Sequence, residues 1–77
     1  MKNIVKGYCA KIEQVSDSLI YKGYPDGQVS ENSPLWAIER ITIDQVTGMT
    51  EVKWASGTTE CIYRWSERTS LNYDFLK

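Results

Sequence analysis

The sequence predicts an all-β fold: a small antiparallel sheet or an SH3-like barrel of about five strands, ending in a short C-terminal turn or helical turn. Three short stretches in its second half, residues 35–44, 49–55 and 59–65, have the composition and length of strands. A turn or a polar stop follows each stretch, which is typical of an antiparallel meander. Helical periodicity is weak throughout, and 77 residues provide for one domain, residues 1–77.

Two further strands are expected in the first half of the chain. Residues 7–15 alternate loosely between apolar and polar side chains, and residues 19–24 form a second short apolar run. The polar residues 16–18 make the turn between them. Residues 25–27, with the sequence Pro-Asp-Gly, suit a tight turn because proline fixes φ and glycine permits unusual backbone angles. The polar residues 28–34 then form the longest loop.

The strand at residues 35–44 carries apolar side chains on both of its faces. Trp36 and Ile38 share one face, whereas Ile41 and Ile43 lie on the other if the strand is regular. Two arrangements satisfy this pattern. Either both faces of the strand are covered, or a bulge near residues 39–40 restores the alternation and coils the strand.

The next two stretches show clearer alternation. Val52 and Trp54 share one face, opposite charged side chains, which is typical of a half-buried strand. The stretch at residues 59–65 places three large side chains on one face: Cys61, Tyr63 and Trp65. Residues 66–71 are expected to form a helical turn, with Ser66 as a possible N-cap and Glu67 in the first turn.

The charge and cysteine content restrict the partners and the compartment. The chain has nine Lys and Arg and ten Asp and Glu, which are interleaved along the sequence. With a pI near 5.3, this balance argues against a nucleic-acid partner. No apolar run approaches the roughly 18 residues that span a bilayer, so no membrane is expected. The N-terminus lacks the apolar core of a secretory leader, which favours synthesis in a reducing cytosol. Cys9 and Cys61 are therefore expected as free thiols, able to pair only within about 7 Å between α-carbons.

The residues needed for most enzymatic chemistry are missing from the sequence. Without histidine, the chain has no histidine-based triad or histidine metal site, and two cysteines cannot close a zinc site. Carboxylates could approach one another across the meander, but cross-strand ion pairs explain them more simply. The acidic members are Glu39, Glu51 and Glu60, and the basic members are Lys53, Arg40 and Arg64. We therefore expect no enzyme, no cofactor and no metal.

The aromatic residues divide into a core set and a surface set. Small β domains fill their interiors with such rings, so the core set is Trp36, Trp54, Trp65 and Tyr63. Tyr21 and Tyr24 are then the surface aromatics. Together with Pro25 and Asp26, they form the candidate interface for a protein partner.

Arg68 follows Trp65 by three residues across the expected turn. One interpretation makes Arg68 a contact in a partner interface. The favoured interpretation makes Trp65 and Arg68 a structural clamp, in which the guanidinium packs on the indole and bonds nearby carbonyls.

These residues resemble a family of short bacteriophage proteins. The resemblance lies in residues 36–42 (WAIERIT), Gly48, residues 53–57 (KWASG) and residues 65–73 (WSERTSLNY), with an upstream match at residues 20–24. The family pattern is a Trp-x-Ile-x-Arg-Ile-Thr strand, a Trp-Ala-x-Gly hairpin and a closing Trp-Asp-Asp-Arg-x-Ser-Leu-x-Tyr. The chain departs where Ser-Glu replaces Asp-Asp, and in the loop after the upstream strand, where the family has small residues.

The resemblance implies a small virion component at the head, neck or tail, with no activity of its own. It would be made in the host cytoplasm, reside in the virion, and contact other virion proteins or copies of itself as a homo-oligomer. An alternative is a monomeric SH3-like adaptor or inhibitor that captures a host protein through Tyr21, Tyr24 and the long loop. Oligomeric state separates the two, since an adaptor would remain monomeric.

Overall fold

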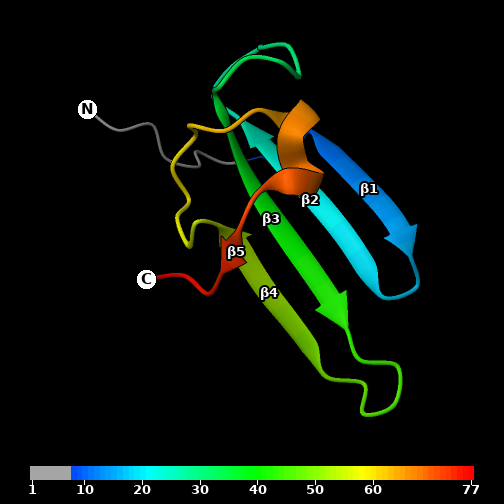
Figure 1. Ribbon diagram of the computed structural model, residues 1–77. Coiled ribbons are helices and arrows are strands. Elements are labelled where there is room, and N and C mark those ends of the chain that lie inside the picture. Colours follow the sequence, from blue (N-terminus) through cyan, green and yellow to red (C-terminus); the bar gives the residue numbers. More distant parts are fainter. Residues whose placement is uncertain (1–7) are drawn as a thin grey trace.

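Five strands lie side by side in chain order in one antiparallel sheet (Figure 1). The computed structural model describes residues 8–77. Its elements are β1 (Lys11–Ser16), β2 (Leu19–Pro25), β3 (Trp36–Ile43), β4 (Thr50–Ala55), the 3₁₀ helix η1 (Trp65–Ser70) and β5 (Tyr73–Asp74). The all-β prediction is confirmed in the form of a single sheet, whose two outer strands are β1 and β5.

The long strand β3 keeps a regular register with both neighbours. Arg40 faces Tyr21 on β2 and Lys53 on β4, without a break at residues 39–40. The register shift lies instead in β1, between Gln14 and Ser16. Of the two arrangements left open by the sequence, the bulge in β3 is therefore excluded, and coverage of both faces holds at the start of the strand, where three consecutive residues are buried.

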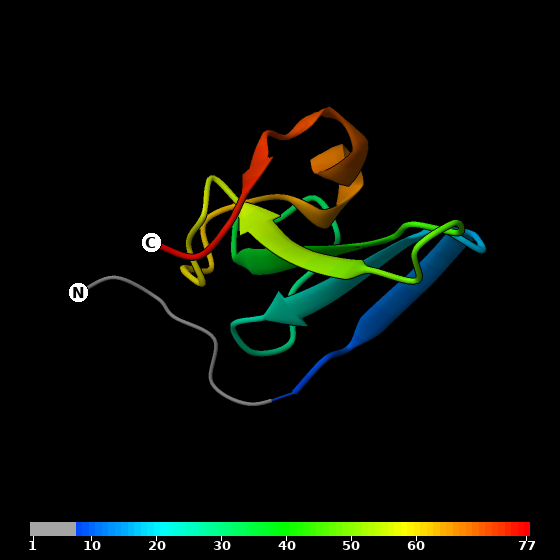
Figure 2. The same cartoon turned by 90° about the horizontal axis from the view of Figure 1, so that it is seen from below.

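One face of the sheet is closed by η1, which Figure 2 shows stacked above the strands. The ring of Trp65 in η1 lies 5.8 Å from the ring of Trp36, centroid to centroid. Around this pair lies the main buried cluster, which also contains Tyr21, Ile38 and Ala55. Burial of these rings removes a large apolar area from water, which stabilises the fold.

Residues 8–77 cover the opposite face only at one end. There Ala37, Trp54 and Cys61 form a second buried cluster, against which Tyr24 packs. Because the strand register alternates, Val52 lies on the same face as Trp54, two residues away, yet 41% of its surface is exposed. Within residues 8–77, η1 is the only helix or strand outside the sheet, and it lies on the other side (Figure 2).

The prediction of a strand at residues 59–65 is wrong. After β4 the chain turns at Ser56 and Gly57, both with positive φ, and the outer edge of β4 pairs with β5. Since that edge is occupied, the intervening segment cannot pair along β4. Within the segment, Tyr63 forms an isolated bridge to Trp36, beyond the end of the β3–β4 ladder.

The helical turn expected at residues 66–71 is confirmed as η1, but its N-cap is not Ser66. Arg64 occupies the cap position, and no side chain caps the helix there. Glu67 lies in the first turn, as expected. No helix among residues 8–77 is long and apolar enough to cross a membrane.

Gly23 is the position at which the main cluster leaves no room for a side chain. A Cβ built there would lie 2.6 Å from Trp65 and 2.9 Å from Trp36. We predict that Gly23→Ala lowers the free energy of unfolding by about 2 kcal/mol or more, because the tryptophan pair must move off the sheet. Urea denaturation followed by tryptophan fluorescence measures the change.

Gly48→Asn is the matched control for this substitution. A Cβ at Gly48 meets no atom within 4 Å, and asparagine tolerates its φ of +75°. Its unfolding free energy should stay within about 0.5 kcal/mol of the wild type. Equal losses in the two variants would contradict the packing argument.

Candidate functional site

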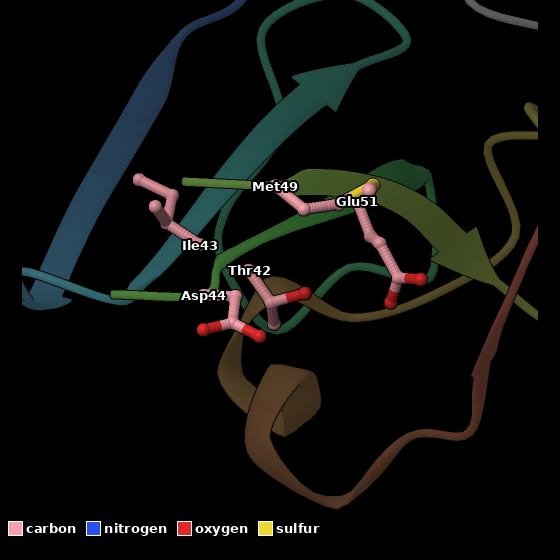
Figure 3. Close-up of a pocket in the computed structure, with 5 residues that line it drawn as sticks. All are labelled: Thr42, Ile43, Asp44, Met49 and Glu51. Carbon is pink, nitrogen blue, oxygen red and sulfur yellow. The ribbon is translucent and has the colours of Figure 1, made fainter. Parts of the chain in front are cut away.

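A pocket of about 370 Å³ opens where the β3–β4 hairpin extends beyond η1 (Figure 3). Its lining residues are Thr42, Ile43, Asp44, Met49 and Glu51. Figure 3 shows the carboxylates of Asp44 and Glu51 on the same side of the hairpin as Thr42, with Ile43 pointing to the other side. Two carboxylates in a recess would suit a cation or acid–base chemistry, so their partners decide what the pocket can do.

Both carboxylates in the pocket already have structural partners. Asp44 Oδ1 accepts hydrogen bonds from the backbone N–H groups of Val46 at 2.9 Å and Thr47 at 3.3 Å, which closes the hairpin turn. These bonds lower the pKa of Asp44 below its ordinary value. Glu51 lies 4.0 Å from the ammonium of Lys53. No group of three or more metal-ligating side chains gathers anywhere in residues 8–77.

The second candidate is the Trp65–Arg68 clamp, and the structure confirms it. The Arg68 guanidinium lies 4.7 Å from the centre of the Trp65 ring, and its Nη1 donates to the Trp65 carbonyl at 3.1 Å. Arg68 also donates two hydrogen bonds to Glu13 on β1, at 2.8 and 3.0 Å. The clamp thus joins η1 to the edge strand β1.

The Arg68–Glu13 pair shifts both groups toward their charged forms. The hydrogen bonds from Arg68 lower the pKa of Glu13, and the carboxylate raises the pKa of Arg68. Glu13 could not be found from the sequence, because 55 residues separate it from Arg68. The alternation of apolar and polar residues in this part of the sequence predicted only that Glu13 lies on a strand.

Tyr73 links the clamp to the central strand. Its hydroxyl donates to the carbonyl of Arg68 at 2.7 Å, and the Arg40 guanidinium lies 4.8 Å from the centre of its ring. Burial is the main cause that raises the pKa of Tyr73. These contacts hold the turn after η1 against the sheet, which is a structural role.

The four residues of the candidate interface do not form one surface. Tyr21 is only 6% exposed and packs against Tyr73, with the ring centroids 5.8 Å apart, so its placement on the surface is wrong. Tyr21 lies directly opposite Arg40 of β3, on the same face of the sheet as Trp36. Its ring therefore faces the tryptophan pair.

Tyr24 lies on the opposite face of the sheet from Tyr21 and is half-buried. Its ring lies 5.3 Å from that of Trp54, and its hydroxyl donates to Glu39 at 2.9 Å. Pro25 pairs with Trp36, and the Asp26 N–H donates to the Leu35 carbonyl at 2.8 Å. Their backbones therefore end the β2–β3 ladder. The use of these three residues as an interface stays a prediction.

The remaining expectations concern the core rings, the charged pairs and the thiols. All three tryptophans are buried, and Tyr63 packs against the main cluster. Neither cysteine forms a disulfide within residues 8–77; Cys61 is buried and Cys9 half-buried.

The expected cross-strand ion pairs are wrong in their partners. Glu51 contacts Lys53 within one strand, Arg64 contacts Glu67 at 3.7 Å, and Arg40 lies over Tyr73. The acidic side chains of Glu39 and Glu60 accept hydrogen bonds from Tyr24 and Thr58.

Sequence reasoning missed one surface feature: a row of aliphatic side chains across the face that η1 leaves open. We call it the open-face row; it contains Ile12, Ile20, Ile41 and Val52. Ile20, Ile41 and Val52 are cross-strand neighbours, and the side chain of Ile12 at the edge is 64% exposed. The parity of β3 was the available signal, because it left Ile41 and Ile43 on the face opposite Trp36.

Comparison with protein-family models, with curated proteins and with solved structures finds no match to this chain. The function must therefore be argued from the geometry and from the phage-like residue pattern.

Removal of the Tyr73 hydroxyl tests the link between the clamp and the sheet. We predict that Tyr73→Phe lowers the free energy of unfolding by about 1 kcal/mol, because the buried Arg68 carbonyl loses its donor while the ring packing is kept. Chemical denaturation measures it. An unchanged midpoint would show that the hydrogen bond contributes nothing.

The lowered pKa of Glu13 predicts a pH-dependent stability. A carboxyl whose folded pKa lies below its ordinary 4.5 stabilises the fold above that pH, and this contribution is lost as the pH falls through the folded pKa. Glu13→Gln should therefore reduce the loss of stability between about pH 5 and about pH 3, measured by denaturation at each pH. Arg68→Lys should reduce this loss of stability in part, because lysine cannot donate two parallel hydrogen bonds to the Glu13 carboxylate. A Glu13→Gln profile parallel to that of the wild type would contradict the assignment.

Proposed function

We propose that the chain is a small, non-catalytic structural component of a bacteriophage particle, at its head, neck or tail, that acts by protein–protein assembly. The observation that carries the proposal is the open-face row beside the outer edge of β1, which has no partner strand among residues 8–77. Exposed aliphatic side chains on a sheet face and a free strand edge are surfaces on which a neighbouring subunit can add. The partners would be other virion proteins or copies of the chain, and the site of action the virion.

The phage-like residue pattern supports the proposal through the fold. Five residues of the pattern contact one another and close one face of the sheet: Trp36, Arg40, Trp65, Arg68 and Tyr73. A sixth, Trp54, lies in the buried cluster on the opposite face. These residues build a scaffold, and the open-face row and the β1 edge supply the contacts.

The alternative is a monomeric adaptor or inhibitor that binds a host protein. Tyr24, Pro25 and Asp26, all half-buried at the end of β2, are the contacts it would use. Burial of Tyr21 removes one of its expected contact residues. The assembly proposal is therefore the better supported of the two.

Mass spectrometry of purified particles tests the proposal. We expect the chain to co-sediment with particles through a density gradient in many copies each, because assembly holds it in the virion. Recovery only from the soluble lysate, bound to a host protein, would favour the adaptor.

Two surface variants show whether the open face takes part. Val52→Lys places a charge in the open-face row and should reduce the copies per particle. Gln28→Lys, on an exposed loop away from that row, is the control and should leave them unchanged. Equal incorporation of both variants would exclude this face as the contact.

A further inference from the structure

The outer edge of β1 carries backbone groups, at defined residues, that bond to no other strand among residues 8–77. The Asp26 N–H donates to Leu35, and the Ile43 N–H donates to Ser18, so the even-numbered residues of β2 bond to β3. The odd-numbered residues of β2 therefore point their backbone groups toward β1, where Tyr21 faces Glu13 and Gly23 faces Lys11. It follows that the N–H and C=O groups of Ile12 point away from the sheet.

The side chains near this edge also leave it accessible. Ile12 is 64% exposed and Val15 is 53% exposed, on an outer strand with no neighbour among residues 8–77. An accessible edge with exposed aliphatic side chains favours addition of another strand.

The charges of Lys11 and Glu13 favour a second copy of the chain as the partner of β1, and they favour one register for that pairing. If a second β1 lies antiparallel with Ile12 opposite Ile12, each Lys11 lies directly opposite a Glu13 of the other copy. A shift of two residues toward the C-terminus places Glu13 opposite Glu13, which is unfavourable. A further shift centres the pair on Gln14, beside the break in the β1 ladder between Gln14 and Ser16. A shift of the register by an odd number of residues would place a residue whose backbone groups point away from the sheet opposite one whose groups point toward β2.

We propose that a second copy of this chain pairs antiparallel with β1, with the two-fold axis at Ile12. The two Ile12 residues exchange backbone hydrogen bonds and their side chains meet on the open face, which joins the open-face rows of both copies. On the other face, each Lys11 pairs with the Glu13 of its partner. The inference rests on the proposed assembly function and names the first partner in that assembly.

The Glu13 carboxylate is already positioned for this contact. Its two hydrogen bonds to Arg68 fix it on the face toward η1, with 40% of the side chain still exposed. Lys11 lies 3.9 Å from Glu31 in an exposed pair, which contributes little by itself. The dimer would therefore add Lys11 to an ordered Arg68–Glu13 pair at small entropic cost.

Sedimentation equilibrium of the intact chain over a range of concentrations tests the proposal. We expect a reversible dimer of twice the 8.9 kDa chain mass. Ile12→Lys should raise its dissociation constant by more than about tenfold, since two like charges would face each other at the axis. Lys11→Glu should weaken it in the same direction, because Glu would then face the partner's Glu13. Ile62→Lys, at a side chain 47% exposed in the loop before η1, is the control and should leave the dimer intact.

Hydrogen exchange supplies a second readout that does not depend on any variant. The Ile12 amide should become protected as the protein concentration rises, whereas amides at the outer edge of β5 should not. A monomer at every concentration, a dimer that survives Ile12→Lys, or equal loss with Ile62→Lys would overturn the proposal. Incorporation of a monomeric chain into particles would refute the dimer alone, whereas a β1 dimer absent from particles would refute the phage role alone.

Discussion

The packing of Trp65 onto Trp36 above Gly23 is the contact on which the rest of the structure depends. A glycine in β2 lets both indoles lie against the strand backbone, where any side chain would displace them. The contact draws η1 over one face of the sheet, and Arg68 secures it by bonding back to Trp65 and across to Glu13. A domain of this size has few other ways to bury so much apolar surface.

The same contact makes the two faces of the sheet unequal. Closure of one face uses the rings of Tyr21, Trp36, Trp65 and Tyr73, whereas Tyr24 and Trp54 lie on the other face. The other face keeps a small buried cluster at one end and the open-face row elsewhere. The pocket at the β3–β4 hairpin does not change this difference between the two faces, because Asp44 already accepts a hydrogen bond within its own turn. The exposed apolar surfaces of the described sheet are therefore the open-face row and the edge of β1.

The phage-like pattern gains its meaning from this arrangement. Five of its residues contact one another and close one face of the sheet: Trp36, Arg40, Trp65, Arg68 and Tyr73. Its third tryptophan, Trp54, packs in the buried cluster on the other face. The contacts of the proposed assembly lie elsewhere, on the open-face row and at the β1 edge.

The sequence by itself determined the all-β class, four of the five strands, the helical turn, the burial of the tryptophans and the Trp65–Arg68 clamp. These follow from period-two alternation, turn residues and a spacing of three, all of which act over a few residues. The tertiary structure decided which segment pairs with β4: β5 occupies its outer edge at Trp54 and Ala55, whereas Tyr63 of the segment 59–65 bridges to Trp36. It also decided the Glu13–Arg68 bond and the burial of Tyr21, since both depend on strand registers that join residues far apart in the chain.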